Sequence, residues 1–226
     1  MRARTLLLLA AALLGACSSL LTSRAAPEQT YYLRAPAVAG GGEALGASLR
    51  VGHPQTDPGL DSPRITLRQP DHRMSFYTGA RWPGPVPDLI ESLAVQTLRA
   101  GGGWSSVEDS TSPFPSDYLL QTTVRRFDAD YSAAGAAPEV HVALDCILGR
   151  REGRDVVASF TAEGSATAGA NRQGAVVEAF EQALGNALQQ LAQRSLEAGR
   201  ADAPHREQEG PQNGVTPAPS SSRPTQ

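Results

Sequence analysis

Of the two cysteines in this 226-residue chain, Cys17 has the more distinctive surroundings. It follows two Arg residues near the start, an apolar run over residues 5–14, and the small pair Gly15-Ala16. A charged segment, a short apolar run and small residues before the processing site are typical of an export signal, and the following cysteine completes a bacterial lipobox. We therefore expect residues 1–16 to be removed and the thiol of Cys17 to carry a diacylglyceryl thioether.

Two other interpretations of this N-terminus are a plain secretory signal with a chance cysteine and an uncleaved membrane helix. The apolar run has about ten residues, whereas a helix needs roughly 20 to span a bilayer. Two or more acyl chains hold a protein stably at a membrane. Because Ser18 follows Cys17, where Asp would favour retention in the inner membrane, we expect an anchor in the outer membrane facing the periplasm. Residues 17–28 would form the lipidated tether.

Cys146 lies in a segment with the alternation of a β-strand. Its apolar neighbours share one face at every second position, and they are Val140, Val142, Leu144 and Leu148. A buried strand thiol is therefore the preferred interpretation, and a catalytic nucleophile is the alternative. With Cys17 acylated, Cys146 has no partner for a disulfide.

No residue pattern in the chain points to an enzyme. The four histidines have no Cys, His or carboxylate at metal-ligand spacing, and they are His53, His72, His141 and His205. There is no Gly-x-Ser-x-Gly elbow and no phosphate-binding loop. The net charge of −3 argues against nucleic acid as a partner, because nucleic-acid-binding proteins usually have a strongly basic surface. We expect a binding or structural protein with no catalytic residue, no metal and no cofactor.

The densest cluster of unusual side chains comprises Phe76, Tyr77, Arg81 and Trp82. One interpretation is that these rings close one edge of the core. The other is a partner-contact patch, because Tyr, Trp and Arg are enriched at protein interfaces.

The elements that would position these residues follow from the hydrophobic periodicity. Short strands are predicted at 31–33, 48–51, 64–68, 73–77 and 104–107, and a first helix at 87–100. Three longer strands follow: one ends at Tyr131 with a β-bulge near Arg125-Arg126, one covers 140–148, and one has Val156, Ala158, Phe160 and Ala162 pointing inward. A second helix is predicted over 172–196, with an apolar stripe of Val176, Phe180, Leu184, Leu188 and Leu191.

This order of elements predicts an α/β (α+β) fold, a two-layer sandwich in which two helices pack on one face of a mainly antiparallel sheet. A single domain is expected over residues 29–198. Residues 199–226 contain five prolines in a polar background and are predicted to be disordered. Truncation after Arg200 should therefore leave the melting temperature unchanged.

The chain resembles the ABC-type transport auxiliary lipoprotein family, the small lipoproteins associated with MCE-type and Pqi lipid transport systems. The likeness covers about residues 28–197. It rests on the lipobox ending at Cys17 and on Tyr31-Tyr32-Leu33, Ser62-Pro63-Arg64-Ile65, Phe76-Tyr77 to Arg81-Trp82, Asp117-Tyr118-Leu119-Leu120 and Phe127-Asp128.

The resemblance implies a non-enzymatic component. Its partners would be an MCE-domain protein that forms a tunnel for phospholipid or other hydrophobic substrates and, through it, an inner-membrane ABC transporter. The lipoprotein would hold the tunnel at the outer membrane, which is compatible with a homo-oligomer. The alternatives are a periplasmic regulator of cell-wall or lipopolysaccharide assembly machinery and a direct lipid carrier with an open apolar cavity.

Overall fold

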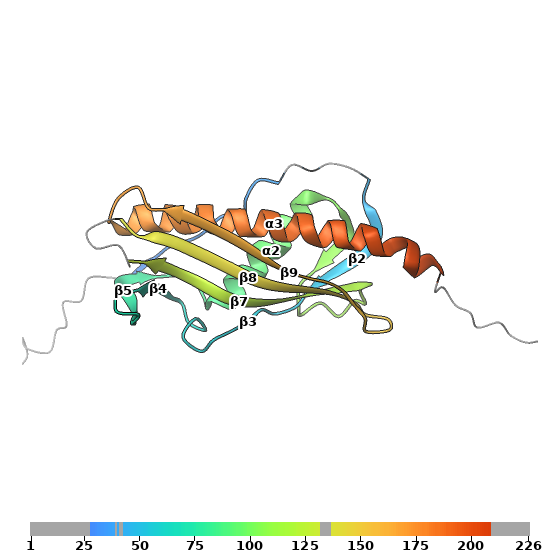
Figure 1. The fold of residues 1–226 in the computed structure, drawn as a ribbon, viewed down its shortest axis with the longest axis horizontal. Coiled ribbons are helices and arrows are strands. Elements are labelled where there is room, and N and C mark those ends of the chain that lie inside the picture. Colours follow the sequence, from blue (N-terminus) through green and yellow to red (C-terminus); the bar gives the residue numbers. More distant parts are fainter. Residues whose placement is uncertain (1–27, 39, 41–42, 132–136, 209–226) are drawn as a thin grey trace, which may run out of the picture.

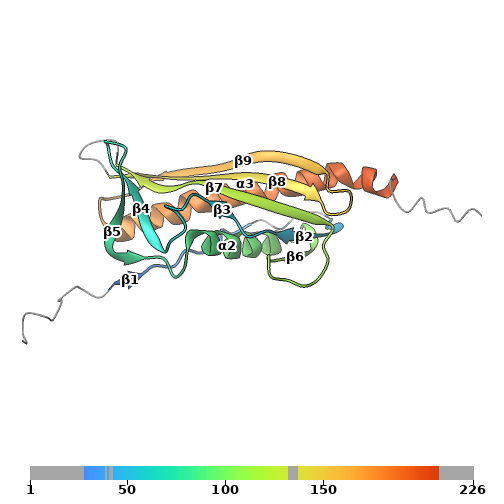
Figure 2. The ribbon, with the colours of Figure 1, turned by 90° about the horizontal axis from the view of Figure 1, so that it is seen from below.

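A computed structural model describes residues 28–38, 40, 43–131 and 137–208. In these residues two helices cover one face of a mixed sheet, so the predicted two-layer α+β architecture is confirmed (Figures 1 and 2). The predicted signal peptide, Cys17 and residues 209–226 lie outside the described residues. The elements are β1 (Gln29–Thr30), β2 (Leu45–Val51), β3 (Gln55–Thr56), β4 (Arg64–Arg68), β5 (Met74–Arg81), α2 (Val86–Gly101), β6 (Trp104–Glu108), β7 (Tyr118–Asp130), β8 (Glu139–Arg150), β9 (Val156–Thr167) and α3 (Gln173–Gln208).

Strand β7 is the centre of the sheet. Along one edge it pairs with β8 over its whole length in antiparallel register, and β9 continues the meander beyond β8. Along the other edge three short strands, β2, β3 and β4, follow one another parallel to β7. The outer strands are β5 and β1 on the β4 side and β6 beside β2. The antiparallel meander confirms the prediction, whereas the parallel pairings were not predicted.

The predicted β-bulge is confirmed at Arg125. The register passes from Val124 opposite Leu144 to Arg126 opposite Ala143, so Arg125 is the extra residue. This shift keeps the apolar side chains before and after the bulge on the same buried face.

A second irregularity, which the sequence analysis missed, lies where β8 meets β9. Leu148 pairs with Ala158, but Gly149 pairs with Val156, so Val157 is an extra residue. Val156 therefore points to the outer face of the sheet and is 65% exposed, and its predicted inward orientation was wrong.

Helix α3 covers the inner face of the meander. All five residues of its predicted apolar stripe are buried against the sheet. At Gly164 of β9 the helix comes so close that an added Cβ would lie 2.0 Å from the carbonyl oxygen of Ala183. Any larger side chain at this position would push the helix away, which explains the glycine.

The same helix also covers part of the free edge of β9. Gln190 donates its side-chain amide to the carbonyl of Glu163 at 2.6 Å and accepts from the Glu163 N–H at 3.2 Å. Arg194 donates to the carbonyl of Thr161 at 2.8 Å. Backbone groups that would otherwise be open to another strand are thus hydrogen-bonded within the chain.

Three aromatic rings join the two layers. Trp82, in the connection from β5 to α2, lies with its ring centroid 5.8 Å from that of Phe127 on β7 and 5.3 Å from that of Phe180 on α3. Phe127 and Phe180 are 4.9 Å apart. All three side chains are fully buried, so one contact set links the central strand, the long helix and the entry to α2.

Helix α3 continues well beyond the predicted end, so the predicted start of a disordered tail at residue 199 was wrong. The helix reaches Gln208, and Asp202 in this extension is only 8% exposed. The Asp202 carboxylate accepts a hydrogen bond of 2.9 Å from the Tyr118 hydroxyl and lies 3.4 Å from Nε of Arg150. A polar contact with the sheet therefore orders this end of the helix.

We expect Phe180→Ala to lower the free energy of unfolding by about 3–5 kcal/mol, because it leaves a cavity beside the other two rings. Urea denaturation measures the change. Phe114→Ala is the matched control, since that ring is 67% exposed and its loss should change stability by about 0.5 kcal/mol at most. Equal effects of the two changes would contradict the assigned packing.

Asp202→Ala should lower the free energy of unfolding by about 1–3 kcal/mol, because it removes a buried carboxylate that accepts from the Tyr118 hydroxyl and lies beside Arg150. Truncation after Arg200 should lower the melting temperature as well, contrary to the sequence-based expectation. A double-mutant cycle with Tyr118→Phe isolates the pair, and a coupling energy near zero would show that the contact does not stabilise the helix end.

Candidate partner-binding site

Trp82 was predicted either to close the core or to contact a partner, and the structure decides for the core. Its side chain is completely buried between Phe127 and Phe180. The prediction of Trp82 as a partner-contact residue was therefore wrong, because a side chain at the centre of a ring cluster cannot reach another molecule.

The other members of the predicted patch do not gather on one surface. The ring of Phe76 lies under the Arg64 guanidinium, with Cζ 3.7 Å from the ring centroid. Tyr77 forms a hydrogen bond with the hydroxyl of Tyr131. Burial, helped by this hydrogen bond, raises the pKa of the Tyr77 phenol.

Arg81, at the end of β5, lies 3.5 Å from the Glu28 carboxylate. All three side chains, of Phe76, Tyr77 and Arg81, are partly exposed. Their role as partner contacts stays a prediction.

Cys146 is a buried strand residue, as predicted. Its thiol lies among the side chains of the inner sheet face, 3.6 Å from the carbonyl oxygen of Leu144. Burial raises the pKa of the Cys146 thiol to about 12. The thiol is therefore protonated at neutral pH, and a protonated thiol is a poor nucleophile.

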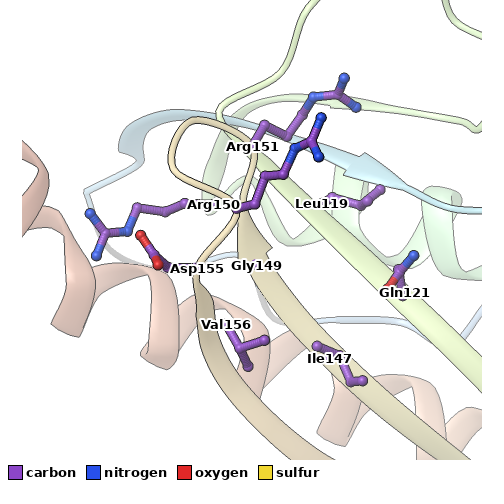
Figure 3. Close-up of a pocket in the computed structure, with 9 residues that line it drawn as sticks. Leu119, Gln121, Ile147, Gly149, Arg150, Arg151, Asp155 and Val156 are labelled. Carbon is purple, nitrogen blue, oxygen red and sulfur yellow. The ribbon is translucent and has the colours of Figure 1, made fainter.

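The surface feature that the sequence analysis missed is a hollow of about 400 Å³ on the outer face of the sheet. It lies where β8 turns into β9, and Figure 3 shows Ile147 and Val156 side by side on these neighbouring strands. We call it the hairpin hollow; its lining residues are Leu119, Gln121, Ile147, Gly149, Arg150, Arg151, Arg154, Asp155 and Val156.

Strand register explains why the hairpin hollow forms. Leu119 of β7 is opposite Gly149 of β8, and Gly149 is opposite Val156 of β9, so the three residues form one row across the sheet. Gly149 has no side chain, which leaves a gap between two apolar ones. Ile147, at the next outward position of β8, borders this gap and is 42% exposed.

The sequence did contain a signal for this surface. Ile147 is apolar although it falls between Cys146 and Leu148, the inward positions of β8, and Val156-Val157 breaks the alternation after the turn. Apolar residues in the outward phase of a strand indicate a covered or binding surface.

A second hollow of about 420 Å³ lies between the end of α2, the helix α3 and residues 37–38. Its lining includes Val38, Leu98, Trp104 and Leu196. Gln189 of α3 donates to the carbonyl of Ala37 at 3.2 Å, which holds the N-terminal segment against the helix beside this hollow.

Within residues 28–208, as far as they are described, no helix has the length and apolar character needed to cross a membrane. The described part of the chain also contains no group of three or more His, Cys, Asp or Glu side chains placed to hold a metal ion.

The helix-covered sheet, with a hollow of mixed apolar and charged lining on its open face, defines a two-layer α+β protein. The chain belongs to the family described as the ABC-type transport auxiliary lipoprotein component, whose model matches residues 31–192. Membership confirms the resemblance seen in the sequence and implies association with an ABC transporter and a membrane-anchored location.

Solved structures show the same fold. A crystal structure of protein XCC0632 from Xanthomonas campestris, of the family model DUF330, is 29% identical and has a TM-score of 0.69, covering 78% of this chain and 99% of that one. A crystal structure of an uncharacterised protein is 15% identical and has a TM-score of 0.58, and the match covers 74% of this chain and 98% of that one. The search of curated proteins gave no match.

In a Cys17→Ser chain, where Cys146 is the remaining thiol, we expect no reaction with Ellman's reagent at pH 8 until urea unfolds the protein. Folding raises the pKa of the Cys146 thiol from the ordinary 9.0 to about 12. The buried, protonated thiol therefore contributes its full share to the free energy of unfolding below pH 9, and this contribution is lost as the pH rises towards 12. Rapid reaction of the native chain would contradict the buried position.

Proposed function

We propose that this chain is an outer-membrane lipoprotein, anchored through Cys17, that serves as the docking component of an MCE-type ABC transport system. It would hold an MCE-domain protein at the periplasmic face of the outer membrane, so that phospholipid or another hydrophobic substrate can pass. The observation that carries the proposal is the family match over residues 31–192 directly after a lipobox that ends at Cys17.

The geometry of the domain supports a docking role. The described chain begins next to β1, which pairs with β5 at Gln29 and Ala80. The β8–β9 hairpin lies at the opposite end of the molecule (Figures 1 and 2). Strand β8 has 12 residues, which corresponds to about 40 Å. A chain anchored at its N-terminus would thus present the hairpin on the side away from the anchor.

The length of the tether fits this arrangement. Residues 17–28 can span at most about 40 Å when extended. This reach lets the folded domain stand clear of the headgroups while it stays bound to the membrane.

We also propose that the role is non-enzymatic and that the chain self-associates. The protonated, buried thiol of Cys146 supports the first statement. The mass of the detergent-solubilised lipoprotein, measured by light scattering, tests the second.

Cys17→Ser should abolish incorporation of labelled palmitate and release or mislocalise the protein, because serine has no thiol to form the thioether and Cys146 is buried and far from the lipobox in the sequence. Ser18→Asp is the matched variant: it should keep the label but move the protein from the outer-membrane to the inner-membrane fraction. Palmitate labelling of Cys17→Ser would refute the anchor, and an unmoved Ser18→Asp would refute the assigned sorting.

Crosslinking of the wild-type lipoprotein in native membranes tests the partner. We expect an MCE-domain protein among the crosslinked species, and Cys17→Ser should lose it. Recovery of cell-wall synthases or lipopolysaccharide assembly proteins in its place would support the alternative regulatory role and overturn the docking function.

A further inference from the structure

We propose that the hairpin hollow is the surface that receives the partner, and that it binds an acidic segment of the MCE-domain protein carrying an apolar side chain. The inference rests on the proposed function and deepens it, because it assigns the contact to a place on the fold and gives the chemistry of the segment that fits there.

The first argument is the exposure of large apolar side chains at one place on the outer face of the sheet. The outward positions of β8 before the hollow are His141, Ala143 and Asp145. At the hollow, Ile147 and Val156 are instead exposed by 42% and 65%. Side chains of this kind gain free energy when a partner removes them from water.

The second argument is shape. Gly149 leaves a gap between Leu119 and Val156 in the same row of the sheet. An added Cβ at Gly149 would lie 3.2 Å from the carbonyl oxygen of Asp155, a tight contact with the neighbouring backbone that favours glycine at this position. The gap is open from outside and suits one apolar side chain of another molecule.

The third argument is charge. The lining contains three Arg residues and one Asp, in a chain whose net charge is −3. Arg150 lies beside Asp202, whereas Arg151 and Arg154 lie within 4.0 Å of no carboxylate in the described part of the chain. Glu152 and Asp155 lie in the same exposed turn, so the border of the hollow carries charges of both signs. An acidic group of the partner would bind at the guanidinium groups of Arg151 and Arg154.

The backbone at Arg154 adds to this argument. Arg154 has φ of 60°, in the left-handed region where a residue other than glycine is strained, and it follows Gly153 with φ of 76°. Glycine at 154 would relieve that strain. The turn instead keeps the Arg154 guanidinium at its tip despite the strain, and strained residues of this kind cluster at binding sites.

The position in the molecule favours a protein over a lipid surface as the occupant. The hairpin lies at the end opposite the start of the described chain (Figures 1 and 2). With the anchor at Cys17, this end is the part of the fold farthest from the point of attachment, where a partner in the periplasm can reach it.

The test uses the full-length lipidated chain in detergent and the purified periplasmic domain of the MCE-domain protein from the same system, with binding measured by interferometry. Val156→Asp adds a carboxylate to the hollow, and Arg154→Gly removes the cation while relaxing the backbone. We expect each to raise Kd at least tenfold. Arg154→Gly should keep or raise the melting temperature, so that its effect cannot come from a weaker fold.

Met74→Asp is the matched control, because Met74 is also an exposed apolar strand residue, at 52%, but lies on β5 outside the hollow. It should change Kd less than twofold. If Val156→Asp lowers the melting temperature by more than a few degrees, Arg154→Gly alone decides.

Each result separates the two proposals. Wild-type affinity of both hollow variants would overturn the hollow as the contact surface while the docking function stands. A wild-type chain that does not bind the MCE domain would overturn the docking function and this partner with it. The third arm is flotation of the Cys17→Ser chain with vesicles of phosphatidylcholine and phosphatidylglycerol. If the Cys17→Ser chain floats with the vesicles and Val156→Asp in that chain abolishes flotation, while MCE binding is unchanged, the hollow is a lipid site and the proposal is overturned.

Discussion

The close packing of α3 against the β-meander is the constraint on which the rest of the fold depends. The inner face of β7, β8 and β9 is apolar at nearly every position, Thr122 of β7 being a polar exception, and it would be exposed without the helix. The helix can reach it because Gly164 has no side chain where the Ala183 carbonyl crosses β9. The Trp82–Phe127–Phe180 rings then tie the same helix to β7 and to the connection that leads into α2.

Features encoded within a few residues could be predicted from the sequence, and features encoded by distant contacts could not. The bulge at Arg125 was visible because the apolar phase changes between Val124 and Phe127. The parallel pairing of β2, β3 and β4 with β7 was invisible, since alternation shows which face is buried but not which strand lies beside it. The end of α3 was missed because Asp202 is ordered by Tyr118, 84 residues away.

The candidate site shows the same division. The aromatic segment around Trp82 is conspicuous in composition, yet its largest ring serves the core. The hairpin hollow has no conspicuous composition, because it depends on Leu119, Gly149 and Val156 meeting in one row across three strands. One extra residue at Val157 sets that row, and a strand slip of this kind cannot be read from periodicity before the register is known.

The hydrogen bonds from α3 to the edge of β9 bear on how copies of this chain can meet. Thr161 and Glu163 already bond to Arg194 and Gln190, so over this stretch β9 cannot act as a template for a strand from a neighbouring molecule. Any assembly of several copies must therefore be held by side-chain surfaces over this stretch rather than by one continuous sheet. Loss of Gln190 would leave two backbone groups near the middle of this 12-residue strand open to pairing with another strand.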